Sequence, residues 1–165
     1  MKKLVILFAS MFIMTIAVQN VSAQDPQSAT ADAAANIITP MTIQKIVDLN
    51  FGNIASPAQA GTVVLGTDNS RTPTNVILPS VTGTVTAAEF TVTGLSDATY
   101  SITFPNSTTI TNAGNTMTID NYTENATNIL TGGSETFKVG ATLNVNADQA
   151  AGAYTGNFIV TVDYN

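Results

Sequence analysis

The sequence predicts an all-β domain built as an antiparallel β-sandwich, and three observations carry this prediction. Apolar and polar side chains alternate over residues 137–147 and again over residues 154–164, which is the period of a half-buried strand. Turn-forming Gly, Asn and Asp residues recur at intervals of roughly ten residues, as they do in sandwiches. Beyond residue 23, no stretch of the sequence shows the sustained 3.6-residue period of an amphipathic helix.

Residues 1–23 are expected to form a cleaved secretory signal peptide. Lys2 and Lys3 precede a nearly continuous apolar stretch that runs from Leu4 to Val18, and the small residues 21–23 provide a cleavage site. The apolar stretch is about five residues shorter than the roughly 20 that cross a bilayer. We therefore expect a signal rather than an anchor, and no later apolar stretch is long enough to suggest a membrane span.

Residues 24–35 are rich in Ala, Ser, Gln and Asp and contain no large apolar side chain. Two interpretations stay open for this segment: a flexible N-terminal tail, or a donor strand that pairs with a sheet edge of a partner. The second interpretation depends on five small or apolar residues that share one parity: Ala29, Ala31, Ala33, Ala35 and Ile37. Alternate side chains of an inserted strand would face the same groove.

Residues 36–165 are expected to form a single sandwich domain. Its first strand is expected at residues 37–43, unless this stretch belongs to a donor. Shorter alternating stretches follow, and two long ones end the chain; the predicted strands are residues 90–92, 100–104, 117–119, 137–147 and 154–164. Thr occupies much of the polar face, as β-branched residues do on pleated surfaces. Residues 112–115 are expected to form a turn.

The composition excludes several classes of chemistry. The chain contains no Cys, His or Trp. It therefore has no disulfides, no Ser-His-Asp or Cys-His unit, and no zinc site built on thiolate or imidazole. Eleven acidic residues are scattered singly, and no pair has a spacing that suggests glycoside hydrolysis. We expect no enzyme and no cofactor.

The charge of the chain disfavours nucleic acid as a partner. Removal of Lys2 and Lys3 with the leader leaves three basic residues against eleven acidic ones, a net charge of −8. Such a chain repels phosphate backbones and anionic lipid surfaces.

Several segments together resemble a family of secreted bacterial domains known as domain of unknown function 4402. The final segment is also distantly similar to that of spore coat protein U-like fimbrial subunits. The segments that carry the resemblance are Ala35–Ile43, Asp48–Ile54, Gly61–Leu65, Phe90–Gly94, Ala98–Ile102 and Ala150–Val162. The resemblance implies an immunoglobulin-like sandwich of the bacterial adhesin and pilin type, a location at the cell surface or in the periplasm of a bacterium, and a periplasmic chaperone as a partner. It implies no catalytic residue.

Two kinds of ligand site were weighed against structural roles. Residues 68–70 and 120–125 offer oxygen ligands suited to calcium, but Asx-rich turns produce the same residues, so no metal site is predicted. Most aromatic residues lie in phase with the apolar side of their strands and are expected in the core. Tyr122 stands in a polar stretch and is therefore the one candidate ligand contact. Tyr154 is expected to brace a corner of the sandwich through a backbone hydrogen bond.

We therefore expect a non-catalytic, exported structural protein of the cell surface, a fimbria-like subunit whose partner is a second copy of itself joined by β-strand addition. The alternative is a monomeric secreted module that binds a carbohydrate or a protein.

Overall fold

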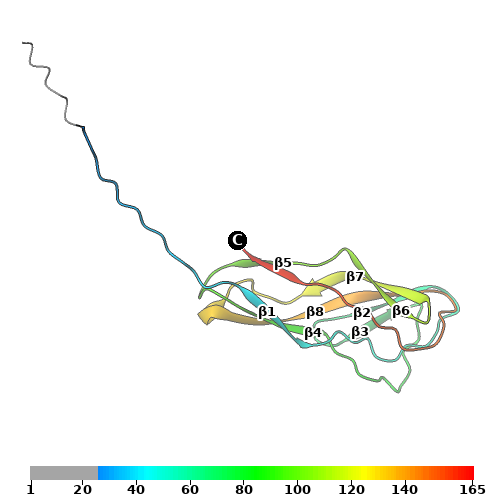
Figure 1. Ribbon diagram of the computed structural model, residues 1–165. Helices are drawn as coiled ribbons and strands as arrows, with labels where there is room; N and C mark the ends of the chain where they lie inside the picture. The colour runs from blue at the N-terminus through cyan, green and yellow to red at the C-terminus, as the bar shows by residue number, and fades with distance from the viewer. Residues whose placement is uncertain (1–25) are drawn as a thin grey trace, which may run out of the picture. The chain divides into compact units, whose positions relative to one another are not determined.

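Strands account for nearly all the regular structure of this chain, in a computed structural model that describes residues 26–165 (Figure 1). The predicted signal peptide, residues 1–23, lies outside the described residues. Residues 37–165 form one compact unit. The described residues before it, 26–36, are exposed and belong to no strand.

The described part of the chain contains nine strands and one three-residue 3-10 turn. In chain order they are β1 (Thr42–Val47), β2 (Gly61–Leu65), β3 (Arg71–Thr74), β4 (Ala88–Thr93), β5 (Tyr100–Thr103), β6 (Ser107–Asn112), β7 (Asn115–Glu124), η1 (Thr131–Gly133), β8 (Ser134–Val145) and β9 (Thr161–Tyr164). Within these residues, no helix has the length and hydropathy needed to cross a bilayer.

β8 is the centre of the larger sheet. Its first half pairs with β4, which pairs in turn with β1, and its second half pairs with β2, which pairs with β3. β7 also pairs with β8, and β6 pairs with β7. Every pairing is antiparallel. β8 is twelve residues long, so β4 and β2 can pair with different halves of it. Its apolar residues alternate along the strand and form one buried face: Phe137, Val139, Ala141, Leu143 and Val145.

A second, two-stranded sheet of β5 and β9 completes the sandwich. In Figure 1 these two strands lie together above β1, β4 and β8. Side chains of both layers meet in one buried cluster, in which Val162 and Tyr164 of β9 and Ile102 of β5 pack against residues of β4 and β8. The predicted all-β antiparallel sandwich is therefore confirmed.

The core consists of two clusters placed along β8. Around its first half lie Phe90, Phe137 and Leu130, and around its second half lie Leu65, Leu143 and further aliphatic residues. The partly buried side chains of Leu49 and Tyr122 pack against both clusters. These two residues therefore link the ends of the core.

The predicted strand over residues 154–164 is wrong for most of its length. Only Thr161–Tyr164 form a strand, whereas Thr155 makes an isolated bridge with Thr111. The alternation of apolar side chains persists because Tyr154, Phe158 and Val160 still point toward the core. Alternation reports burial on one side of an extended chain, and it does so whether or not a neighbouring strand is present.

The first strand begins later than predicted, at Thr42 rather than Ile37. Pro40 explains the delay, because proline has no amide hydrogen to give to a ladder. β3 and β6 were not predicted, since β3 contains Pro73 and β6 is dominated by polar residues. The predicted turn at residues 112–115 is confirmed as the hairpin between β6 and β7, with positive φ at both central residues.

Candidate functional site

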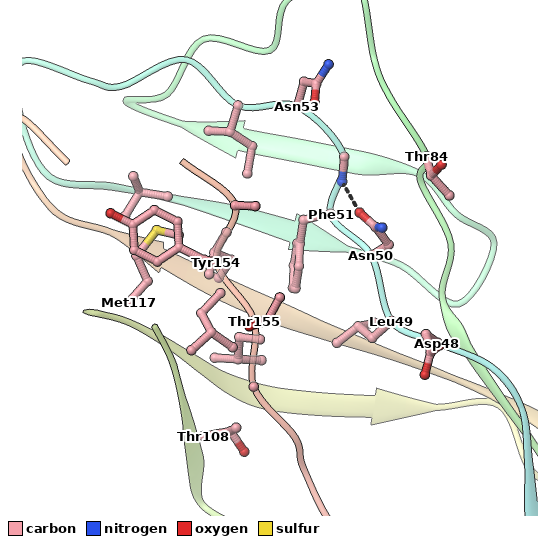
Figure 2. A pocket seen from close by; sticks show the side chains of 18 of the residues that line it. Asp48, Leu49, Asn50, Phe51, Asn53, Thr84, Thr108, Met117, Tyr154 and Thr155 are labelled. Carbon is pink, nitrogen blue, oxygen red and sulfur yellow. Dashed lines mark hydrogen bonds between the residues drawn. The ribbon is translucent and has the colours of Figure 1, made fainter. Parts of the chain in front are cut away.

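A slot of about 1070 Å³ reaches the core between two segments of the chain, and its lining combines apolar core residues with polar residues of the walls. One wall is residues 45–56, which follow from β1, and the other is residues 149–158, which lead toward β9. Figure 2 shows both walls, with Leu49 and Phe51 on one and Tyr154 and Thr155 on the other. Its floor consists of core residues of the sheets: Ala88, Phe90, Ile110, Met117, Ile119, Leu143 and Val145.

The first wall is fixed by a tight turn and by an arginine. The side-chain oxygen of Asn50 accepts a hydrogen bond from the amide of Gly52 over 2.9 Å, and Gly52 has a φ of 70°. The Arg71 guanidinium donates to the carbonyl oxygens of Phe51 and Asn53 over 2.8 and 3.0 Å. This wall is thereby tied to β3, and the ring of Phe51 is held against the core.

The second wall begins at a braced corner. The hydroxyl of Tyr154 donates to the carbonyl oxygen of Ala150 over 2.7 Å and accepts from the side-chain amide of Gln149 over 2.7 Å. The backbone hydrogen bond expected of Tyr154 is therefore present. Farther along, a Cβ on Gly156 would lie 2.7 Å from the carbonyl oxygen of Thr109, so only glycine allows this close approach to β6.

Beyond this corner, the main chain of the second wall has little hydrogen bonding. Among residues 26–165, none exchanges a main-chain hydrogen bond with residues 156–160. The segment is held instead by side chains, since Phe158 packs against Phe90 with ring centroids 6.1 Å apart and against Tyr122 at 5.1 Å. In the described structure, β9 pairs only with β5, and its second edge carries no strand. Residues 156–158 of this segment line the slot, and β9 follows just beyond it.

Tyr122, the predicted ligand contact, lies in an aromatic row beside the slot. Its ring stacks on Phe104 with centroids 5.6 Å apart, and its hydroxyl is 2.7 Å from that of Thr108. Burial raises the pKa of its phenol. The ring is only partly exposed and packs against both core clusters, so it resembles the other aromatic residues of the chain more than a free surface platform.

A β-bulge explains why the sequence pattern placed Tyr122 on the polar side. On β7, Met117 and Ile119 face the core, whereas on the far side of the bulge it is Tyr122 that does so. The register with β8 shifts between Asp120 and Thr123, and Asn121 has a φ of 47°. One extra residue therefore reverses the inward parity of the strand.

The five predicted donor residues lie outside the strands. Ala29, Ala31, Ala33 and Ala35 are exposed, and the side chain of Ile37 is 96% exposed. Burial of such an exposed isoleucine side chain against a partner would be favourable.

The two charged side chains that line the slot, Lys45 and Asp48, pair with each other. Lys45 lines the slot and forms an ion pair with Asp48 over 2.5 Å, both side chains being largely exposed.

The Asp68 carboxylate accepts hydrogen bonds from the amide and hydroxyl of Ser70, which lower its pKa. Residues 68–70 thus form the turn that competed with the calcium interpretation. No three His, Cys, Asp or Glu residues cluster as metal ligands within residues 26–165.

Away from the slot, the Glu135 carboxylate is held by several donors. It accepts hydrogen bonds from the hydroxyl of Tyr100 over 2.7 Å and from the amide and hydroxyl of Thr127. Burial raises the pKa of Glu135, but these hydrogen bonds outweigh burial and lower it below its ordinary value. Burial and the bond to Glu135 raise the pKa of Tyr100. The hydrogen bond between Tyr100 and Glu135 thus links β5 to β8, one strand from each sheet.

Sequence reasoning missed the slot itself. Leu49 was recognised only as part of a family-like segment, Phe51 was also considered among the aromatic residues, most of which were expected in the core, and Phe158 was placed on a regular strand. Gly152 and Gly156 could have indicated the opening. They interrupt the alternation of apolar and polar residues along the second wall, where main-chain hydrogen bonds are sparse.

Comparison with known proteins gives one match. The family model described as Domain of unknown function (DUF4402) matches residues 41–164. No curated protein and no solved structure matches the chain.

Proposed function

Because this chain belongs to the DUF4402 family and carries an extended segment ahead of the family domain, we propose that it is an exported structural subunit that joins to its neighbours by β-strand addition. The domain serves as the acceptor, and residues 28–38 serve as the donor strand. The subunit acts at the bacterial cell surface without catalysis, after passage through the periplasm.

One observation supports this proposal: the chain combines an exposed segment before the domain with a domain whose last strand has an edge left unpaired by the described residues. The donor half is an extended, exposed segment with small apolar residues at alternate positions, ending in Ile37. The acceptor half is a domain whose last strand, β9, is paired on one edge only. Each main-chain hydrogen bond formed would contribute about 1 kcal/mol net, and each buried methyl about 0.8 kcal/mol.

The immunoglobulin-like character of the sandwich is part of the same proposal. It is supported by the bond from the Tyr154 hydroxyl to the carbonyl of Ala150, since a tyrosine that bonds a few residues upstream braces a corner in such sandwiches. A periplasmic chaperone is the second proposed partner, because an exported chain with an open sheet edge would otherwise expose it before assembly.

The test is the mass of the purified protein in solution. Residues 24–165, measured by light scattering over a hundredfold range of concentration, are expected to form species larger than a monomer. Deletion of residues 24–36 is expected to give a monomer with an unchanged circular dichroism spectrum. If the longer protein is a monomer at every concentration, the strand-addition proposal fails.

The second candidate function is a monomeric secreted module that binds a carbohydrate or a protein, and the volume of the slot is the observation that favours it. A glycan array probed with the monomeric deletion variant tests it. Tyr122→Ala could lose binding simply because the domain unfolds. The comparison therefore includes Tyr122→Phe, which keeps the ring. Retained binding in Tyr122→Phe with loss in a correctly folded Tyr122→Ala would favour this function.

A further inference from the structure

The slot has the properties of an acceptor for one particular segment of a second copy. We propose that residues 29–37 of one copy lie in the slot of the next, between the wall of residues 45–56 and the wall of residues 149–158. This inference rests on the proposed function and adds to it the place of insertion and the face of the donor that inserts.

The main chain of the second wall supplies the pairing edge. Residues 156–160 are extended and, in the part of the chain that the structure describes, exchange no main-chain hydrogen bonds, although Phe158 anchors them to the core. Their continuation, β9, lies beyond the slot lining and pairs, within the described residues, only with β5. A strand laid in the slot would therefore reach the free main chain of residues 156–158 and could continue along the open edge of β9 without displacing a strand already present.

The composition of the donor suits the depth of the slot. The floor is already occupied by large side chains, including Phe90 and Met117, which are each buried to more than nine-tenths. The small methyl groups of alanine would let the main chain of the donor lie close to this floor without displacing its side chains. The inward residues of the donor are Ala29, Ala31, Ala33, Ala35 and Ile37, and the single charge of the segment, Asp32, falls on the opposite face.

The entry to β1 favours a second copy over the chain's own slot. Thr39 precedes Pro40, which restricts it to extended conformations, and its carbonyl oxygen is bonded by the Tyr164 hydroxyl over 2.9 Å. A segment that returned to its own slot would have to reverse between residues 36 and 39. Ile37 would then lie within the reversal and could not insert.

The first experiment compares two alanines on opposite faces of the donor. In residues 24–165, Ala33→Asp is expected to weaken self-association at least tenfold by light scattering, because its carboxylate would face the apolar floor of the slot. Ala34→Asp places the same charge one residue away on the outward face and is expected to change association less than threefold. Equal effects of the two variants would overturn the proposed face.

The second experiment blocks the slot. Ala153 lines it and is exposed, so Ala153→Trp is expected to abolish association while the circular dichroism spectrum stays unchanged. Ala113→Trp, in the exposed hairpin turn between β6 and β7, is the matched control and is expected to associate normally.

The third experiment uses the absence of cysteine from the natural chain. Ala33 is the middle residue of the donor and Ala153 lies near the middle of the second wall, so a donor that fills the slot brings these two positions together. Copies carrying Ala33→Cys are mixed with copies carrying Ala153→Cys and oxidised with diamide, and a disulfide-linked dimer is expected, since bridging requires Cα atoms within about 7 Å. Replacing the second variant with Ala113→Cys is expected to give no dimer above background.

The outcomes separate the inference from the function on which it rests. A wild-type protein that stays monomeric overturns both. A wild-type protein that associates, but is indifferent to Ala153→Trp and forms no specific disulfide, keeps the proposed function and overturns the slot as the acceptor. A monomeric double variant, Ala33→Cys with Ala153→Cys, that forms the disulfide within one chain also overturns the inference.

Discussion

The hydroxyl of Tyr164 donates a hydrogen bond to the carbonyl oxygen of Thr39 over 2.9 Å. The same hydroxyl accepts a bond from the amide of Leu95 over 2.6 Å. The end of the last strand is thereby joined to the entry of the first strand, across the two layers of the sandwich. Gly94 permits this arrangement, because a Cβ at that position would lie 2.3 Å from the tyrosine oxygen.

Tyr164→Phe is expected to lower the free energy of unfolding by about 1–2 kcal/mol, because it removes both hydrogen bonds and keeps the ring in the core. Urea denaturation followed by circular dichroism measures the loss. Asp163→Asn, on the exposed neighbour, is the control and is expected to change stability by less than about 0.5 kcal/mol. An equal loss in both variants would contradict the role assigned to the hydroxyl.

Asn121→Val is expected to destabilise the domain by about 1–2 kcal/mol, since a β-branched residue is strained at a φ of 47°. Asn121→Gly is expected to leave stability nearly unchanged, because glycine adopts this conformation readily. Thermal melting of the two variants provides the comparison. If Asn121→Val melts at the same temperature as the wild type, the bulge is not fixed at this residue.

Tyr122→Ala is expected to cost about 3 kcal/mol, whereas Tyr122→Phe costs about 1 kcal/mol, the contribution of the bond to Thr108. The difference reflects the packing of the ring between Phe104 and Phe158. Urea titration of both variants measures it. If Tyr122→Ala is as stable as the wild type, the ring does not contribute to the core, and its role as a ligand contact is favoured instead.

Gly140→Ala is expected to destabilise the domain by about 2 kcal/mol or more, because a Cβ there would lie 2.2 Å from the carbonyl oxygen of Leu65, within the centre of the sheet. Gly114→Asn, in the open turn between β6 and β7, is expected to be tolerated. Denaturant midpoints compare the two. If Gly140→Ala is neutral, the spacing between β2 and β8 must differ from that described.

Glu135→Gln is expected to be less stable than the wild type at neutral pH, with the difference shrinking in acid. The pKa of Glu135 in the folded state lies below its ordinary value of 4.5, so its charge contributes stability above that pH, and this contribution is lost as the pH falls through the lowered pKa. Melting temperatures measured from pH 7 to pH 3 test the convergence. A constant difference between the two proteins would show that the charge of Glu135 has no stabilising role.

The long strand β8 and the class of the fold could be predicted from the sequence, because strict alternation from Phe137 to Val145 has one simple structural solution. The hairpin at residues 112–115 could also be predicted, since Asn, Ala and Gly report local conformation directly. These features depend on neighbouring residues alone.

The slot and the orientation of Tyr122 could not be predicted in this way. A bulge at Asn121 changes the parity of β7 in one step, and nothing in the local pattern of polar residues marks where it falls. Residues 156–160 alternate like a strand but lack a neighbour, and whether a neighbour exists is decided by distant parts of the chain. The same pattern therefore predicts burial correctly and hydrogen bonding wrongly.

The position of β8 at the centre of the sheet has a consequence for how the protein folds. β8 pairs with β2, which lies far earlier in the chain, and with β4, so the core can close only after residues 134–145 have been brought back to segments remote in sequence. Loop closure over such distances slows folding, and all-β domains dominated by non-local pairing fold in milliseconds to seconds. If the chain is exported before it folds, as proposed, it would remain unfolded for a comparatively long time. During this time its unpaired strands could bind another protein.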